Sequence, residues 1–206
     1  MLNKLNGLYV ITDNTLTPEN TILEQVEKAL IGGAKIVQYR DKVNKDEDIE
    51  KLVLTLQSLC RRYRALFVLN DRIDLAIKLQ CDGLHVGKSD YHRIKDIRIP
   101  FLGYLGVSCY GDIETAKKMQ DLRVDYVAFG AFFSSSTKPN ADVVDTDIIK
   151  KAKEQLDIPV CAIGGITTEN VADLTKNNID MVAVISDIWN SEDITKKCEE
   201  FKKLLG

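Results

Sequence analysis

Soft metal ligands are scarce in this chain of 206 residues. It contains two histidines and five cysteines, and no two cysteines stand in the CxxC spacing that is common in zinc sites and redox centres. The sequence therefore argues against zinc, and we expect any bound metal to have oxygen ligands. The cysteines are odd in number and widely dispersed, which is typical of reduced thiols in the cytosol. They are Cys60, Cys81, Cys109, Cys161 and Cys198.

Long apolar runs and an excess of charge of either sign are missing as well. The apolar stretch near the N-terminus ends at Asp13, and no run approaches the roughly 18 apolar residues that a membrane span needs. The net charge of −3 is too small to steer the protein to nucleic acid or to an anionic membrane. We therefore expect a cytoplasmic protein that acts on small molecules. Monomer and homodimer both stay open.

Two further absences narrow the fold class. No linker rich in proline, glycine or serine divides the chain, and its four prolines lie at the edges of predicted helices and strands. Residues 1–206 are therefore expected to form a single domain. The dinucleotide fingerprint GxGxxG is also absent after the first predicted strand, which runs instead into Thr12, Asp13 and Asn14.

Short apolar runs rich in β-branched residues alternate with helical stretches eight times along the chain. The strands are expected at residues 8–12, 36–40, 66–69, 83–86, 102–107, 126–129, 160–163 and 181–185. The helices are expected at residues 19–31, 45–63, 72–79, 90–96, 111–122, 145–155, 168–177 and 191–205. Each unit has about 26 residues, close to the least that a strand and a crossover helix require. The pattern predicts an α/β fold, a closed (β/α)₈ barrel of the TIM type, with an open doubly wound sheet as the alternative.

Polar side chains cluster where the second predicted strand ends. Because side chains alternate along a strand, Gln38, Arg40 and Lys42 share one side, and Tyr39 and Asp41 share the other. In barrels of this kind, the carboxyl ends of the strands carry the active site. Two cations and an amide at the same end of the barrel favour an anionic ligand, and a diphosphate suits them. A solvated strand end is the plain alternative.

Two aspartates follow the next two predicted strands. Asp71 comes after the third strand, and Asp90 follows the fourth. Carboxylates from neighbouring strand ends suit Mg²⁺, which protein carboxylates usually hold together with substrate phosphates and water. Both residues also stand just before predicted helices, so helix capping is the alternative.

The remaining strand ends point to a second phosphate. The long polar connection at 130–144 is typical of a lid, and its Lys138 could neutralise a departing phosphate, although such a segment can also be a plain flexible loop. Gly164 and Gly165 follow the seventh strand and Ser186 follows the eighth, where barrels often bind phosphate; a tight turn is the alternative for the glycines. His85 is expected to be a hydrogen-bonded residue of the barrel interior rather than a catalyst.

In order and spacing, these segments resemble the thiamine phosphate synthase family over nearly the whole chain. The segments are LYVITD at 8–13, QYRDK at 38–42, NDR at 70–72, DGLHVG at 82–87, GVS at 106–108, STK at 136–138, AIGGI at 162–166 and VIS at 184–186. Segments such as GGI occur in other phosphate-binding barrels, whereas QxRxK followed by NDR and TK is more specific.

The resemblance implies a Mg²⁺-dependent transferase that joins a pyrimidine diphosphate to a thiazole phosphate by a dissociative reaction. It implies that the pyrimidine diphosphate is bound by Gln38, Arg40, Lys42, Asn70, Ser108 and Lys138, of which Arg40, Lys42 and Lys138 act in catalysis. It implies that the thiazole phosphate is bound by Ser135, Ser136, Thr137, Gly165, Ile185 and Ser186. Asp71 and Asp90 are the implied Mg²⁺ ligands.

Two other functions stay open. A thiazole tautomerase of the same superfamily keeps the thiazole phosphate site but loses the pyrimidine and metal residues, which this chain retains. A phosphate-binding barrel without catalysis is the third hypothesis. The chain also departs from the family at Ala131, Ser134 and Ser135, where prolines and a threonine are usual, at Lys88, and at Asp187. Asp187 would place a negative charge beside the thiazole phosphate unless its side chain points away.

Overall fold

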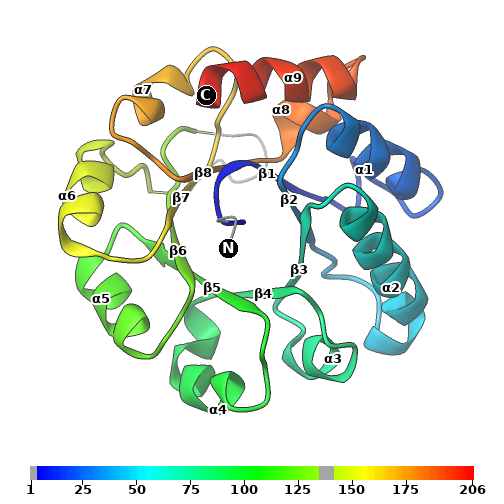
Figure 1. Ribbon diagram of the computed structural model, residues 1–206, viewed down its shortest axis with the longest axis horizontal. Helices are drawn as coiled ribbons and strands as arrows, with labels where there is room; N and C mark the ends of the chain where they lie inside the picture. Colours follow the sequence, from blue (N-terminus) through cyan, green and yellow to red (C-terminus); the bar gives the residue numbers. More distant parts are fainter. Residues whose placement is uncertain (1–3, 135–141) are drawn as a thin grey trace.

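The computed structural model describes residues 4–134 and 142–206. Eight parallel strands follow one another around a closed barrel, and helices cover its outside (Figure 1). The strands are β1 (Gly7–Ile11), β2 (Ile36–Tyr39), β3 (Leu66–Asn70), β4 (Gly83–Val86), β5 (Tyr104–Tyr110), β6 (Tyr126–Phe129), β7 (Val160–Ile163) and β8 (Met181–Val184). The closed barrel predicted from the sequence is confirmed, and the open sheet is excluded because β8 pairs with β1.

Helices follow the strands in the expected order, with two differences. They are α1 (Ile22–Ile31), α2 (Asp46–Arg62), α3 (Ile73–Lys78), the 3₁₀ helix η1 (Lys88–Arg93), α4 (Ile94–Arg98), α5 (Ile113–Asp121), α6 (Asp147–Gln155), α7 (Ala172–Thr175), α8 (Ser186–Trp189) and α9 (Ile194–Leu205). The expected helix at 90–96 is split between η1 and α4. The short helix α8 was not predicted, because four residues are too few to show a helical period.

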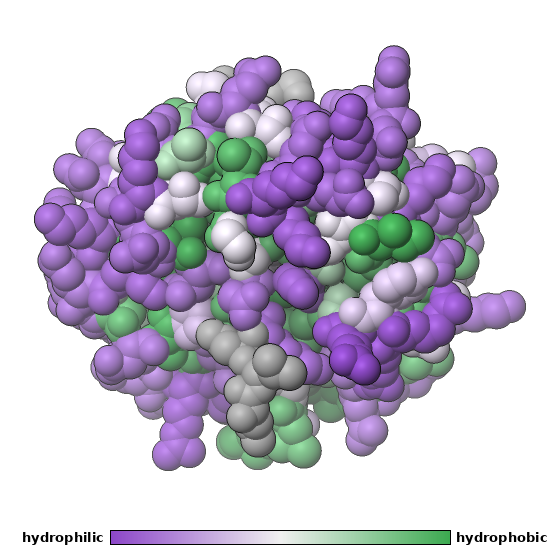
Figure 2. All heavy atoms as spheres, turned by 45° about the horizontal axis from the view of Figure 1, so that its top comes forward, coloured by the Kyte–Doolittle hydropathy of each residue, from purple (hydrophilic) through white to green (hydrophobic). Residues whose placement is uncertain are grey.

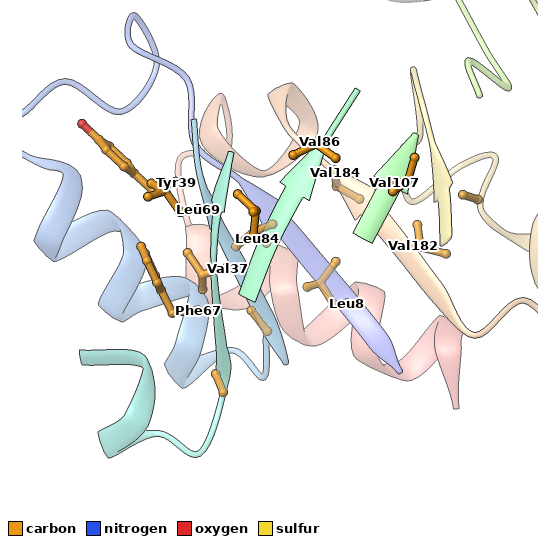
Figure 3. Close-up of a cluster of buried hydrophobic side chains, with 14 of the residues drawn as sticks. Leu8, Val37, Tyr39, Phe67, Leu69, Leu84, Val86, Val107, Val182 and Val184 are labelled. Atoms are coloured by element: carbon orange, nitrogen blue, oxygen red, sulfur yellow. The ribbon is translucent and has the colours of Figure 1, made fainter. Parts of the chain in front are cut away.

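The outer face of the barrel and the helices form one hydrophobic core. Figure 3 shows side chains such as Leu8, Val37, Phe67 and Leu84 projecting from neighbouring strands into this layer. The α-helices contribute buried apolar residues, whereas η1 has none; in α1 the buried residues include Ile22, Val26 and Ala29. The strands are therefore buried on both faces, as is usual for parallel sheets.

A second, smaller core fills the barrel interior. It contains aliphatic residues such as Ile36 and Val68, and also two fully buried tyrosines, Tyr9 and Tyr126. Side chains rather than solvent therefore occupy the lumen, as in other eight-stranded barrels of this kind.

The surface carries no extended apolar face in the view of Figure 2, where hydrophobic residues form small groups between hydrophilic ones. Among the helices of the described segments, none has the length and apolar character of a membrane span. Because all eight strands are parallel, their carboxyl ends meet at one rim of the barrel. The predicted polar residues of the described segments lie near or just after these ends, so the fold brings them to the same side of the molecule.

Candidate active site at the carboxyl ends of the strands

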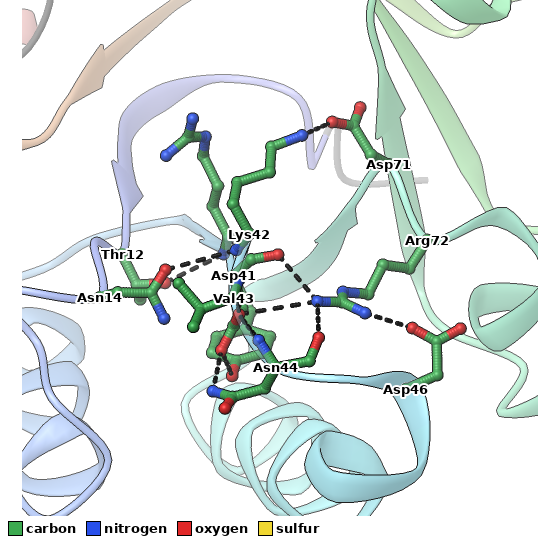
Figure 4. A network of polar contacts seen from close by, with 11 residues as sticks. Thr12, Asn14, Asp41, Lys42, Val43, Asn44, Asp46, Asp71 and Arg72 are labelled. Carbon is green, nitrogen blue, oxygen red and sulfur yellow. Dashed lines mark hydrogen bonds and ion pairs between the residues drawn. The ribbon is translucent and has the colours of Figure 1, made fainter.

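The turn between β2 and α2 is built around the carboxylate of Asp41 (Figure 4). This carboxylate accepts hydrogen bonds from the backbone N–H groups of Val43 and Asn44, at 2.8 and 2.9 Å, and from the Asn44 side chain at 2.7 Å. Tyr39 Oη donates to it from 3.0 Å. Burial opposes the charged form, but the hydrogen bonds from Asn44 and Val43 outweigh it and hold the pKa of Asp41 well below its usual range. Asp41 is therefore ionised and fixes the turn.

Arg72 ties this turn to the end of β3. Its guanidinium donates to the backbone carbonyls of Asp41 and Asn44, at 3.0 and 2.6 Å, and forms an ion pair with Asp46 at the start of α2. These contacts hold the turn that carries Lys42 against the segment that carries Asp71. Neither Asp41 nor Arg72 was predicted as a site residue, because their role depends on backbone groups that a sequence pattern does not reveal.

The structure brings Lys42 and Asp71 into direct contact. The Lys42 ammonium forms an ion pair with the Asp71 carboxylate, and both side chains are partly exposed at the rim (Figure 4). Asp71 has a positive φ of 60°, and its backbone N–H donates to the carbonyl of His85 on β4. Arg40 is anchored through its backbone N–H, which donates to Thr12 Oγ1 at 3.0 Å, and within the described segments no side chain pairs with its guanidinium.

Asn70, the last residue of β3, contains an unsatisfied buried donor. Its side chain is 8% exposed, and its amide nitrogen Nδ2 has no hydrogen-bond partner among the described residues. Buried polar groups in proteins almost always have a partner, and leaving one unmade costs about 1–3 kcal/mol. A bound ligand that accepts a hydrogen bond at this point would remove the penalty.

Asp90, the second predicted metal ligand, lies in η1 directly after β4. Its carboxylate accepts from Ser89 Oγ at 2.8 Å and lies 3.7 Å from the Arg93 guanidinium. Across the described segments, no group of three or more histidine, cysteine or acidic side chains forms a metal cluster. Two carboxylates at neighbouring strand ends nevertheless suit an ion that takes its other ligands from phosphate and water.

A hydrogen-bond chain crosses the barrel interior from β2 to β5. Gln38 Nε2 lies 2.6 Å from Tyr9 Oη, which lies 2.9 Å from Tyr126 Oη. Tyr126 Oη is 3.0 Å from His85 Nδ1, and His85 Nε2 is 2.8 Å from Ser108 Oγ. Burial lowers the pKa of His85 to about 4 and raises the pKa of both tyrosines, so all three rings are uncharged at neutral pH. His85 is a hydrogen-bonded interior residue, as predicted.

The glycines after β7 permit a close approach between two loops. Gly165 has a φ of 62°, and a Cβ there would lie 2.5 Å from the carbonyl oxygens of Phe133 and Ser134. Phe133 N–H also donates to the Gly164 carbonyl at 3.0 Å. Gly164 and Gly165 both have positive φ and form a bend that lies against the segment that follows β6. The predicted residues Ser135, Ser136, Thr137 and Lys138 lie outside the described residues.

The two predicted residues after β8 begin the short helix α8, with Ile185 as its N-cap and Ser186 as its first residue. The neighbouring carboxylate of Asp187 accepts a hydrogen bond from the Thr168 backbone at 3.3 Å and lies 3.7 Å from the Lys197 ammonium. Lys197 therefore balances the charge of this unusual aspartate from the side of α9.

Comparisons with known proteins agree with this fold. The sequence profile of the thiamine monophosphate synthase (TMP-TENI) family matches residues 8–188. The thiamine-phosphate synthase of Wolinella succinogenes is 43% identical over 91% of this chain and 87% of that protein. The thiamine-phosphate synthase of Thermoplasma acidophilum is 38% identical over 98% and 93%. The solved structure of thiamine phosphate pyrophosphorylase from Pyrococcus furiosus superposes with a TM-score of 0.88 at 36% identity, and covers 98% of this chain and 96% of that one.

The fold and the groups at the rim define the class to which this protein belongs. It is a (β/α)₈ barrel whose strand ends carry cationic, acidic and amide groups suited to a phosphorylated ligand. Within that class, the chain belongs to the thiamine monophosphate synthase family. It is thus a transferase that forms thiamine phosphate.

Proposed function

We propose that this protein is a Mg²⁺-dependent thiamine phosphate synthase that transfers a hydroxymethylpyrimidine group from its diphosphate to a thiazole phosphate, carboxylated or not. The observation that carries the proposal is the convergence at one rim of the Lys42 ammonium, the Asp71 carboxylate and the unsatisfied amide of Asn70. A cation, a metal-binding carboxylate and a free donor are the groups that a diphosphate and its counter-ion require.

The proposed reaction is dissociative. The bond between the pyrimidine methylene carbon and the diphosphate oxygen breaks, and the diphosphate leaves with the electron pair. The lone pair of the thiazole nitrogen then forms a bond to the methylene cation. The plain thiazole yields thiamine phosphate directly, and the carboxylated one yields it after its carboxylate leaves as carbon dioxide. No side chain needs to act as a nucleophile. The protein stabilises the charge that develops on the leaving group and holds the acceptor close, and both effects contribute strongly to rates.

Asp71 and Asp90 would hold Mg²⁺, as their oxygen donors and their positions after neighbouring strands suit that ion. When bound, the ion supplies positive charge to the diphosphate oxygens. In the structure Lys42 neutralises Asp71, and the Arg93 guanidinium lies 3.7 Å from the Asp90 carboxylate. Release of Lys42 from Asp71 would make its ammonium available to the diphosphate.

The other roles follow the family resemblance. Arg40, Lys42 and Lys138 stabilise the leaving diphosphate, and Gln38, Asn70 and Ser108 bind the pyrimidine diphosphate. The thiazole phosphate is bound by Ser135, Ser136, Thr137, Gly165, Ile185 and Ser186. The position of Gly165 against the segment that follows β6 supports its proposed role in binding the thiazole phosphate.

The test is to incubate the purified protein with hydroxymethylpyrimidine diphosphate, thiazole phosphate and Mg²⁺, and to follow thiamine phosphate and diphosphate by mass spectrometry. We expect both products in equal amounts, and their loss when Mg²⁺ is chelated. The Asp71→Asn variant removes the metal-binding charge while keeping the side-chain shape, and we expect it to lose activity. A folded protein that gives no product, or one that works equally well without Mg²⁺, would overturn the proposal.

A further inference from the structure

The barrel interior contains more polar side chains than filling the lumen requires. Gln38, Tyr9 and Tyr126 are at most 3% exposed, and His85 is 8% exposed. Burying such groups costs free energy unless every hydrogen bond is made, and aliphatic residues would fill the same space without this requirement. Their hydrogen bonds instead join into one continuous chain that ends at Ser108.

The path of this chain depends on a glycine. In the strand register, His85 on β4 pairs with Gly106 on β5, and Gly106 pairs with Tyr126 on β6. A Cβ at position 106 would lie 2.0 Å from a ring carbon of Tyr126. Because Gly106 has no side chain, the Tyr126 ring occupies its place and reaches His85 across the intervening strand.

The donor in each hydrogen bond of this chain can be assigned by starting from Gln38. Gln38 directs its amide nitrogen at Tyr9 Oη, and a nitrogen of this kind can only donate. The Tyr9 hydroxyl proton then has Tyr126 Oη as its acceptor, and the Tyr126 proton has His85 Nδ1. An imidazole whose Nδ1 accepts a hydrogen bond carries its proton on Nε2, and that proton is donated to Ser108 Oγ.

We propose that Tyr9, Tyr126 and His85 are positioning residues that set the direction of the Ser108 hydroxyl, so that it donates its proton to the substrate rather than to His85. Within the described residues Ser108 Oγ forms a hydrogen bond with no side chain except His85, so its own proton is free to be donated to a ligand at the rim. An acceptor such as a ring nitrogen of an aminopyrimidine fits this donor. The identity of that acceptor rests on the proposed function; the direction of the chain does not.

The direct test is NMR spectroscopy of the unliganded protein with ¹⁵N-labelled histidine. The chain has only two histidines, His85 and His92, so a His92→Gln variant assigns the signals. We expect His85 to carry its proton on Nε2, with Nδ1 unprotonated. A His85 that carries its proton on Nδ1 would overturn the inference, because Ser108 would then donate inward. This result is independent of whether the protein makes thiamine phosphate.

The effect of the hydrogen-bond chain on substrate binding is tested with Tyr126→Phe. This variant removes the hydroxyl that donates to His85 Nδ1. We expect this variant to lose the fixed Nε2 tautomer and to bind hydroxymethylpyrimidine diphosphate about tenfold more weakly with Mg²⁺ present, which corresponds to one hydrogen bond of typical strength. Its affinity for thiazole phosphate should stay unchanged. Tyr63→Phe is the matched control, because its hydroxyl bonds only to surface Glu27 at 2.9 Å. Equal affinity of Tyr126→Phe and the unaltered protein for the pyrimidine diphosphate would refute the coupling.

A second pair of variants covers the case in which Tyr126→Phe does not fold. In His85→Gln, the side-chain amide can still donate to Ser108, as Nε2 does, whereas His85→Leu has no donor. We expect the glutamine variant to keep clearly more affinity for the pyrimidine diphosphate than the leucine variant. Equal loss in both would mean that His85 acts through packing alone, which contradicts the inference.

Discussion

Asp41 organises the rim although its side chain is directed away from the barrel interior. It accepts hydrogen bonds from the turn that carries Lys42, and Arg72 fastens the same turn to the end of β3. Two kinds of residue can therefore be distinguished at this rim: those proposed to contact a ligand, and those, such as Asp41, that hold the backbone carrying them. We expect substitution of the first kind to change catalysis while the fold is preserved, and substitution of the second kind to lower stability as well.

Asp41→Ala tests the holding role. The change leaves the backbone N–H groups of Val43 and Asn44 and the Tyr39 hydroxyl without their acceptor, so we expect the free energy of unfolding to fall by roughly 1–3 kcal/mol. We also expect the KM for the pyrimidine diphosphate to rise, because the turn no longer holds Lys42. Urea unfolding and steady-state kinetics measure both effects. Asp173→Ala, which removes only a surface ion pair with Lys176, should change neither, and an Asp41→Ala protein with full stability would contradict the role.

Lys138→Ala tests the contact role in catalysis. Loss of one preorganised positive charge beside a leaving group should lower kcat by about a hundredfold or more, with the fold preserved. Lys150→Ala, a change on the exposed side of α6, should leave kcat unchanged. Circular dichroism checks the fold of both variants. Turnover of Lys138→Ala close to that of the unaltered protein would refute the assignment.

Much of this residue-level arrangement follows from simple alternation. Gln38 lies in the barrel interior, while Tyr39 and Asp41 contact each other on the outside, as the spacing along the strand predicts. The pairing of Tyr9 with Tyr126 could not be predicted, because these residues are 117 positions apart and each alone is typical of a hydrophobic core. Closure of the barrel brings the two tyrosines together. It depends on how the strands pair, and the sequence around each tyrosine does not reveal it.

The strands determine where the chemistry lies, because all eight carboxyl ends reach the same rim. Their positions were predicted well, since buried runs of β-branched residues give a strong local signal. The helices on the carboxyl side of β4 and β8 were predicted less well. Residues 88–93 form a 3₁₀ helix and residues 186–189 a single turn, and such short segments leave no period to detect.

Gly106→Ala tests how β5 accommodates its neighbours. The new methyl group would overlap the Tyr126 ring, so we expect a loss of roughly 1–3 kcal/mol in the free energy of unfolding from overpacking. We also expect the His85 to Tyr126 hydrogen bond to break, which histidine NMR would detect. At Gly87 the nearest atom to an added Cβ is 3.9 Å away, so Gly87→Ala should stay within about 0.5 kcal/mol of the unaltered protein. A fully stable Gly106→Ala would show that the ring has room to move.

Across the protein as a whole, the five cysteines are free and buried, distributed over both core layers. Burial raises the pKa of Cys60, Cys81, Cys109 and Cys198 to about 12, and that of Cys161 further. The thiolate is the reactive form, so the native thiols should react very slowly with a thiol reagent at pH 8. All five should react promptly in denaturant. Fast modification of the native protein would show that these core layers open readily.

The central claim is that Mg²⁺ and the cationic side chains act together on a diphosphate at one rim of the barrel. The most direct measurement is calorimetric titration of hydroxymethylpyrimidine diphosphate into the protein with and without Mg²⁺, repeated with Asp71→Asn. We predict tight binding only when Mg²⁺ and Asp71 are both present. Equal affinity without the metal, or in the Asp71→Asn variant, would contradict the account.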